Sequence, residues 1–386
     1  MPYNSSIAVI GCAISAPISK ADRSLEELIY EVTQRALEDG GVEIEDIDGL
    51  VVGSNDQFDG RAISVMAASG SVGGVDRDIL STPSAGEHAF IMGALRIASG
   101  QYRTHVIASW SPTEASSLAE AERLGADPYF HRILPLDDLA SHALQAVALG
   151  AGVPGVHDLA ISVLAKNRRN GARAYPGAGV PSADPAAIAA SPVTRWPLRR
   201  DMVAPPVTGA VALVLASGAH VEERRSANPA FIHGMGWATE ASFLGDRDLS
   251  RAPALEAAAQ RAYAEAGISD SGKAFDLAEV ADATPYQELL AYEGLGLSPR
   301  TRWRSDVSSG AFDRGGRLPV NPSGGASTIN PVFCTGLIRI AEAANQIRGR
   351  AGHHQIAGAK RALAHAASGF AMQYQSVVVF GSDERV

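Results

Sequence analysis

The chain has 386 residues, of which 46% are hydrophobic and 19% charged, and its formal net charge is −9. This composition is typical of a globular protein with a large buried core. The acidic balance, without any run of like charges, excludes a nucleic-acid-binding surface.

The sequence predicts neither export nor a membrane span. The N-terminal stretch "MPYNSSIAVIGCAIS" lacks the basic region and the full apolar core of a signal peptide. No stretch of about 18 apolar residues is present, which is the length needed to cross a bilayer. Cys12 and Cys334 lie far apart, so we expect two small buried thiols in a reducing compartment, with the cytoplasm as the location.

The first part of the chain alternates between predicted strands and helices. An apolar strand over 6–15 precedes a helix over 24–41, where apolar residues recur at helical spacing and two glycines end the pattern. A second strand follows over 47–54. A long apolar helix starts near Pro83, and a third strand covers 104–111.

The same order recurs in the second part of the chain. The predicted elements are a strand at 230–237, a helix at 252–267, a strand at 275–284, a helix within 324–349 and a strand at 376–382. This repeat predicts two α/β halves related by a pseudo-twofold axis. The second helix of each half follows a turn of small residues. We therefore expect two helix N-termini to meet at one central site, which suits an anion or an oxyanion.

A stretch rich in alanine, glycine and proline separates the two repeats. We interpret 117–200 as an inserted loop and helical region, after which the chain returns to the sheet through the strand-like run at 205–217. This gives an N-terminal half (1–116 plus 201–225), the inserted region, and a C-terminal half (226–386).

Three long motifs carry a family resemblance. They are "SPVTRWPLRRDMVAPPVTGAVALVLAS" at 191–217, "DATPYQELLAYEGLGL" at 282–297 and "NPSGGASTINPVFCTGLIRIAEAANQIRG" at 321–349. They resemble the thiolase superfamily, and in detail the branch of the sterol carrier protein x thiolase and its bacterial lipid-transfer-protein relatives. The resemblance implies the thiolase fold: duplicated α/β halves in a layered αβαβα arrangement with an inserted loop region.

The catalytic positions of that family are replaced in this chain. The nucleophilic cysteine of C-x-S-G falls on Pro83, and the histidine of G-H-P falls on Asn330. The histidine of H-D-x-F falls on Ala281, which leaves Asp282 in place. The C-terminal C-x-G corresponds to Ser368 and Gly369 at best, without the cysteine.

The remaining candidates each have a catalytic and a structural interpretation. Ser84 opens the pattern S-x-x-E, so it is either a helix cap or a substitute acyl acceptor. Asn330 either donates to a thioester oxyanion or only breaks strand from helix. Asp282, Tyr286 and His88 are candidate bases, or respectively a structural carboxylate, a packed aromatic and a core histidine.

The sequence indicates less strongly which residues contact the substrate. The glycine turn of N-P-S-G-G has no Walker spacing but suits a pantetheine chain, and the two arginines of W-P-L-R-R-D suit CoA phosphates or a solvated face. The residues are Gly324, Gly325, Ser368, Gly369, Arg199 and Arg200. The histidines show no metal-binding spacing, so we expect no metal and no cofactor beyond coenzyme A as part of the substrate.

Retro-aldol cleavage of a β-hydroxyacyl-CoA fits the groups that remain, because it requires a base and an oxyanion hole but no acyl-enzyme. The resemblance implies this activity too, since relatives without the cysteine are aldolases that shorten steroid side chains. The departure from them is that they have tyrosines where this chain has Ala281 and the region of Asn330. A non-catalytic scaffold subunit and an acyltransferase with an unusual nucleophile stay open as alternatives.

The expected partners are an acyl-CoA thioester and other protein chains. The resemblance implies a small partner with an OB-fold and a zinc ribbon. We also expect a homodimer, because the strand "THVIASWS" at 104–111 is apolar and is predicted to lie at an edge of the sheet.

Overall fold

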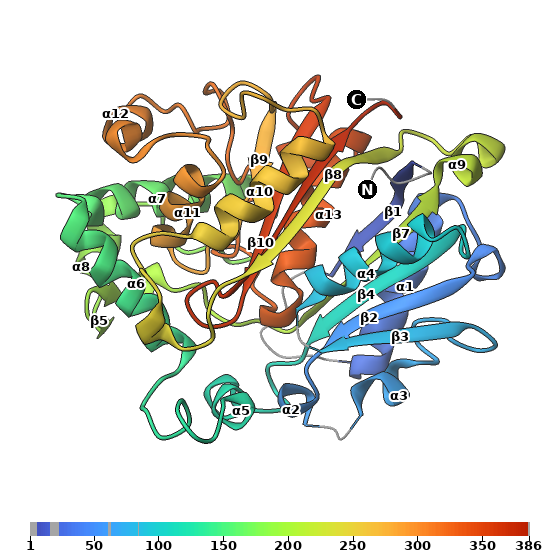
Figure 1. The fold of residues 1–386 in the computed structure, drawn as a ribbon, viewed down its shortest axis with the longest axis horizontal. Coiled ribbons are helices and arrows are strands. Elements are labelled where there is room, and N and C mark those ends of the chain that lie inside the picture. Colours follow the sequence, from blue (N-terminus) through green and yellow to red (C-terminus); the bar gives the residue numbers. More distant parts are fainter. Residues whose placement is uncertain (1–5, 16–22, 61–62, 84, 385–386) are drawn as a thin grey trace.

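The computed structural model describes residues 6–15, 23–60, 63–83 and 85–384. Within these residues, nine strands form one mixed sheet in the order β3-β2-β4-β7-β1-β8-β11-β10-β9 (Figure 1). The strands are β1 (Ile7–Ile14), β2 (Gly49–Ser54), β3 (Asp78–Pro83), β4 (Thr104–Ser111), β7 (Gly209–Ser217), β8 (Ala230–Thr239), β9 (Leu277–Glu279), β10 (Arg361–Ser368) and β11 (Tyr374–Gly381).

The strand order divides this sheet into two parts with the same topology. The sequence β2-β4-β7-β1 in one part matches β9-β10-β11-β8 in the other. In each part the first pair of strands is parallel and the next two pairs are antiparallel. The parts meet at a narrow seam, where β1 and β8 pair through Ala8 with Phe231 and Val9 with Ala230. The predicted duplication is confirmed.

Helices cover both faces of each part. The helices α4 (Gly86–Ala98) and α13 (Thr335–Arg348) pack side by side, and both contribute to a buried core shared with strands of both halves. On the outer faces, α1 (Leu25–Gly40) packs on β1 and β7, and α10 (Pro253–Glu265) packs on β8 and β11. The layered αβαβα arrangement is therefore confirmed, with the helices after Pro83 and Asn330 in the central layer.

Glycines let the outer helices approach the strands at equivalent places in the two halves. A Cβ on Gly11 of β1 would lie 2.1 Å from the carbonyl oxygen of Ala36 in α1. In the second half, a Cβ on Gly234 of β8 would lie 2.1 Å from the carbonyl oxygen of Ala262 in α10. Both contacts are too close for any side chain, which explains why small residues are abundant in these elements.

The inserted region forms helices at the left and lower side of the molecule in Figure 1. Its elements are α5 (Leu118–Gly125), α6 (Asp138–Gly152), α7 (Val156–Ala174), α8 (Pro185–Ala190) and the short strands β5 (Val193–Arg195) and β6 (Leu198–Arg199). Both α6 and α7 pack against α11 (Pro285–Gly294) of the second half.

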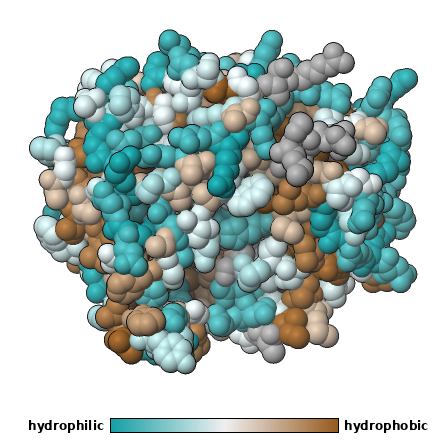
Figure 2. Space-filling view, in the orientation of Figure 1, coloured by the Kyte–Doolittle hydropathy of each residue, from teal (hydrophilic) through white to brown (hydrophobic). Residues whose placement is uncertain are grey.

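Exposed apolar side chains gather on the connection between α5 and α6, at the lower left of Figure 2. The exposed residues there are Leu124, Tyr129, Phe130 and Ile133. The other short helices are α2 (Asp56–Asp59), α3 (Ser64–Ala68), α9 (Gly218–Arg224) and α12 (Trp303–Ser308). In the described ranges, no helix combines the length and apolar character required to cross a bilayer.

Two strands of the nine-stranded sheet were missed in the sequence, as were the short strands β5 and β6, and one strand was misplaced. The strands β3 and β10 were not predicted, because one is short and ends in proline and the other, "RALAHAAS", is rich in alanine, which favours helices. The strand at 104–111 was predicted to lie at an edge, but β4 lies between β2 and β7 with every residue buried. The edge strand of the first half is β3, so a homodimer formed by pairing of sheet edges would use β3 instead.

Candidate active site

A cavity of about 860 Å³, here called the central cavity, opens where α4 and α13 begin. Its remaining walls come from the β9–α11 connection, the β10–β11 turn and the helices α5 and α6 of the inserted region. The sequence-predicted positions that line it are Pro83, His88, Ala281, Asp282, Asn330, Ser368 and Gly369. The structure therefore brings all four replaced thiolase motif positions to one place.

The helix α4 begins after Ala85, its N-cap residue, which has φ 34° and lies one residue after the N-cap that the predicted capping box requires. Ser84 itself, and with it the predicted cap, lies outside the described residues. Glu87 is buried, and a Cβ on Gly336 would lie 2.3 Å from its Oε2. The nucleophile position at Pro83 presents neither a thiol nor a hydroxyl to the central cavity.

Asn330 is held in a fixed orientation at the start of the region that leads into α13. Its Nδ2 donates to the carbonyl oxygen of Ala204 at 2.9 Å, and its Oδ1 accepts from Thr335 Oγ1 at 2.9 Å. The Nδ2 atom carries a second hydrogen, which has no acceptor within the described part of the protein. Asn330 thus retains one donor at the central cavity, as an oxyanion-binding role requires.

Asp282 lines the central cavity but both of its oxygens already accept hydrogen bonds. Oδ1 accepts from the backbone N–H of Ala326 at 2.6 Å, and Oδ2 accepts from Asn167 Nδ2 at 2.8 Å. Burial, and next the nearby Glu288 carboxylate, raise the pKa of Asp282 to about 8. These contacts fix Asp282 as a brace between the inserted helix α7 and the second half.

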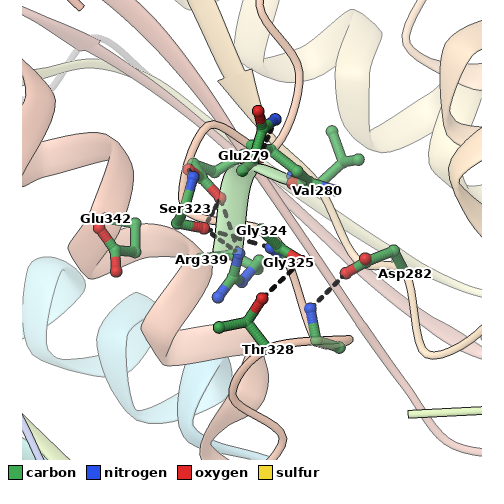
Figure 3. Close-up of polar contacts among 12 residues, drawn as sticks. Glu279, Val280, Asp282, Ser323, Gly324, Gly325, Thr328, Arg339 and Glu342 are labelled. Carbon is green, nitrogen blue, oxygen red and sulfur yellow. Dashed lines mark hydrogen bonds and ion pairs between the residues drawn. The ribbon is translucent and has the colours of Figure 1, made fainter. Parts of the chain in front are cut away.

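The N-P-S-G-G turn serves this brace and does not line the central cavity, contrary to the predicted role of Gly324 and Gly325. A Cβ on Gly325 would lie 2.1 Å from Asp282 Oδ2, and φ there is 67°. Beside it, Glu279 Oε2 accepts from Arg339 Nη1 and from Ser323 Oγ, both at 2.7 Å (Figure 3). The motif that identified the family is therefore a buried structural network.

Three other predicted site residues lie away from the central cavity. The Tyr286 hydroxyl lies 2.6 Å from His157 Nδ1, and burial raises the pKa of this tyrosine above its ordinary range. Arg199 donates to the carbonyl oxygen of Ser191 at 2.7 Å, and Arg200 is exposed. None of Tyr286, Arg199 and Arg200 lines the central cavity.

The β10–β11 turn forms a strained wall of the central cavity. Ala371 and Met372 both adopt positive φ, 49° and 58°, which costs energy for residues with side chains. Arg247 holds the turn by donating to the carbonyl oxygens of Phe370 and Ala371, at 2.8 and 2.5 Å. Near the opposite end of the turn, Tyr374 meets the ring of His88 edge-on, with the ring centroids 5.6 Å apart.

The inserted region adds titratable groups to the central cavity that sequence reasoning missed. Glu122 of α5 and Asp138 and His142 of α6 line the central cavity. Glu122 Oε2 accepts from the backbone N–H of Asp138 at 3.0 Å, and His142 Nε2 lies 3.1 Å from Asp138 Oδ2. The i,i+4 spacing of aspartate and histidine in "DLASH" was the available signal, because it places both on one helix face.

Carboxylates line the central cavity without any lysine or arginine among the described lining residues. Its acidic lining residues are Glu122, Asp127, Asp137, Asp138 and Asp282. Among the described residues, no lysine or arginine and neither cysteine lines it. The described ranges also contain no group of three or more histidine, cysteine, aspartate or glutamate residues that could hold a metal ion.

Comparisons with known proteins agree with this architecture. A family profile described as "Thiolase C-terminal domain-like" matches residues 234–382. Sterol carrier protein 2 of Oryctolagus cuniculus is 42% identical over 109 residues, a match that spans 28% of this chain and only 20% of the rabbit protein. An acetyl-CoA acetyltransferase of Methanothermobacter thermautotrophicus is 27% identical over 93% of this chain and 95% of its own length.

A solved structure, described as "Ltp2-ChsH2(DUF35) aldolase", shares the fold over the whole length of both chains. Its TM-score is 0.83 and its sequence identity 21%. At this identity the match establishes a common architecture and leaves the chemistry to the residues of the central cavity.

Proposed function

Because this chain is a thiolase-like protein of the sterol-carrier-protein and lipid-transfer branch, we propose that it cleaves a β-hydroxyacyl-CoA by a retro-aldol reaction without a covalent acyl-enzyme. One observation carries the proposal: the central cavity keeps an oriented amide donor at Asn330 and has lost the thiol at the nucleophile position. A steroid side chain is one candidate for the acyl group.

The reaction requires few groups. A base removes the proton of the β-hydroxyl, the bond between the α- and β-carbons breaks, and its electron pair moves onto the thioester as an enolate. The second Nδ2 hydrogen of Asn330 is placed to donate to that enolate oxygen. An acid then protonates the α-carbon, which yields a shorter acyl-CoA and a carbonyl compound.

An acyltransferase with an unusual nucleophile has less support. Burial raises the pKa of the Cys12 thiol to about 12 and that of Cys334 well above its ordinary value, so neither forms a thiolate easily. A non-catalytic scaffold subunit is the second candidate. The simultaneous replacement of the thiolase cysteine by Pro83 and of a histidine by Asn330 favours it.

We also propose that the active form includes other chains. The structurally similar aldolase joins Ltp2 to a DUF35 protein, ChsH2. A small acyl-CoA-binding partner of this kind, with the OB-fold and zinc ribbon implied by the family resemblance, would supply the cations for the CoA phosphates that the central cavity lacks. A homodimer is expected through the edge strand β3, and light scattering that gives a monomer mass would contradict it.

The test is product formation by the chain purified with whatever copurifies. β-Hydroxyacyl-CoA thioesters are added, and mass spectrometry detects the carbonyl product. Asn330→Ala should lower kcat by about 10²–10³, the usual effect of removing one oxyanion donor. Ser84→Ala should leave turnover per folded molecule nearly unchanged. Loss of turnover in Ser84→Ala, with an acyl adduct on the parent chain, would indicate the acyltransferase. No turnover in any form would favour the scaffold.

A further inference from the structure

The proposed reaction requires a base and an acid. Of the predicted bases, His88 lines the central cavity and packs edge-on against Tyr374, but Asp282 and Tyr286 are poorly placed. Both oxygens of Asp282 already accept hydrogen bonds, and Tyr286 lies outside the central cavity. Glu122 and Asp138 line the central cavity from two different helices, and the 3.0 Å hydrogen bond from Asp138 N to Glu122 Oε2 holds these helices together.

A chain of hydrogen bonds determines which ring nitrogen of His142 carries the hydrogen. The carbonyl oxygen of Ala371 can only accept, so Gln145 must present its Nε2 to it, at 3.1 Å. Gln145 then presents Oε1 to Gln287, whose Nε2 donates to it at 3.2 Å. The same Nε2 lies 3.1 Å from His142 Nδ1, so Nδ1 accepts.

The consequence is an imidazole that carries its hydrogen on Nε2. This hydrogen points at Asp138 Oδ2, 3.1 Å away. Asp138 is therefore an oriented acceptor that lines the central cavity, and its other oxygen, Oδ1, has only a long 3.5 Å contact from Ser141 Oγ. The arrangement begins at the strained turn around Ala371, which is also held by a 2.9 Å hydrogen bond from its N–H to Ser141 Oγ of α6.

Glu122 differs from Asp138 in its electrostatic surroundings. It is half-buried and faces the carboxylates of Asp138 and Asp137, and the one donor to it is the backbone N–H of Asp138. Burial first, and then these two carboxylates, raise the pKa of Glu122 to about 8. Arg195 offsets this negative charge only from the solvent side, where it pairs with Asp137 at 3.3 Å. The raised pKa favours the protonated form of Glu122, which makes it the candidate acid of the pair.

We propose that Asp138 is the base and Glu122 the acid of the central cavity, and that His142 is the residue that positions Asp138. This inference rests on the proposed function. Asp138 takes the proton of the β-hydroxyl, the bond between the α- and β-carbons breaks, and the electron pair moves to the thioester oxygen. Glu122 gives its proton to the α-carbon. Proton exchange between Asp138 and Glu122 restores the starting state, so one proton is taken and one is returned.

The test uses the full chain with any copurifying partner and β-hydroxy-β-phenylpropanoyl-CoA as the probe, which would release benzaldehyde and acetyl-CoA. Asp138→Asn and Glu122→Gln should each lower kcat by about 10²–10⁴. Both changes keep the size of the side chain and an oxygen acceptor. Glu120→Gln removes the same charge from an exposed site on the same helix and should retain parental kcat. Thermal unfolding checks that each variant is folded.

Replacement of the positioning residue, His142, should change the pH profile of the reaction as well as its rate. His142→Gln should lower kcat about tenfold and move the acidic limb of the pH profile to higher pH, because Asp138 loses a donor that stabilises its charged form. A purely structural role would lower the amount of active protein without moving that limb.

The outcomes separate the two proposals. If the parent cleaves the probe and both carboxyl variants match Glu120→Gln, the acid–base assignment is wrong and the retro-aldol function stands. If the parent cleaves no β-hydroxyacyl-CoA, the function fails and the catalytic assignment fails with it. Infrared difference spectra of the parent against Glu122→Gln at neutral pH should show a protonated carboxyl in the parent, and its absence would exclude Glu122 as the acid in either case.

Discussion

Asp282 and Asp138 both line the central cavity, yet the protein surrounds them in opposite ways. Asp282 is buried and receives a donor on each oxygen, from Ala326 and Asn167. Asp138 receives a close donor only on Oδ2, from His142, because the contact of its Oδ1 with Ser141 Oγ is 3.5 Å long, and it lies beside the half-buried Glu122. The difference teaches that exposure to a cavity does not by itself make a carboxylate a base. An oxygen without a close protein donor is also needed.

The largest expected effect tests the structural side of this comparison. Asp282→Ala removes the acceptor of the buried Ala326 N–H and one of the two acceptors of Asn167 Nδ2, which keeps its 2.6 Å hydrogen bond to Glu288 Oε2. We expect a loss of about 3 kcal/mol in the free energy of unfolding, since an unpaired buried group costs about 1–3 kcal/mol and a further hydrogen bond is lost. Glu122→Ala, where water reaches the site, should cost about 1 kcal/mol or less. Urea unfolding measures both, and equal losses would remove the distinction.

A smaller effect tests the fit of the N-P-S-G-G turn around Asp282. Gly325→Ala places a Cβ 2.1 Å from Asp282 Oδ2 at φ 67°, so it combines a left-handed backbone with crowding. Gly349→Ala is the matched control, because φ is 70° and nothing lies within 4 Å of its Cβ. Each change should cost about 1–2 kcal/mol for the backbone. Crowding should add about 1–3 kcal/mol for Gly325 alone, and the difference in urea midpoints reports it.

A third effect concerns the pH dependence of stability at Glu122, on the side of the central cavity formed by α5 and α6. The folded state raises the pKa of Glu122 to about 8, so it binds a proton that the unfolded chain releases near the ordinary glutamate value. The free energy of unfolding therefore falls as pH rises through this window. Glu122→Gln should make that fall shallower between about pH 5 and pH 8. Glu120→Gln should keep the parental slope, and a steeper slope in Glu122→Gln would contradict the assignment.

The sequence predicted the parts of the site that depend on local motifs. Asp282 lies between β9 and α11, and Asn330 lies shortly before α13. The duplicated topology was therefore enough to predict that these two residues come together at the central cavity. The same motifs misled on Gly324 and Gly325, because a glycine turn gives no indication of whether a ligand or a buried carboxylate fills the space beside it. Only the packed structure places Asp282 there.

The side of the central cavity formed by α5 and α6 could not be predicted from the sequence, for a different reason. Glu122 and Asp138 are separated by a loop and belong to helices that pack against distant parts of the chain: α5 packs against α2, and α6 packs against α11. No pattern within 117–200 indicates that these helices turn their carboxylates towards the central cavity. Tertiary packing likewise decides where Arg199 and Arg200 lie: both are outside the lining of the central cavity, and Arg199 donates to a backbone carbonyl, so their role as CoA contacts stays a prediction.

The pairing of β1 with β7 has a consequence for the order of folding. β1 spans Ile7–Ile14 and its partner β7 spans Gly209–Ser217, so nearly 200 residues separate strands that are neighbours in the sheet. Contacts of such long sequence separation form slowly, because a large loop must close first. A nascent chain that stops before β7 lacks the strand that joins β4 to β1. The helices that carry Glu122 and Asp138 therefore leave the ribosome before the first half of the sheet can close.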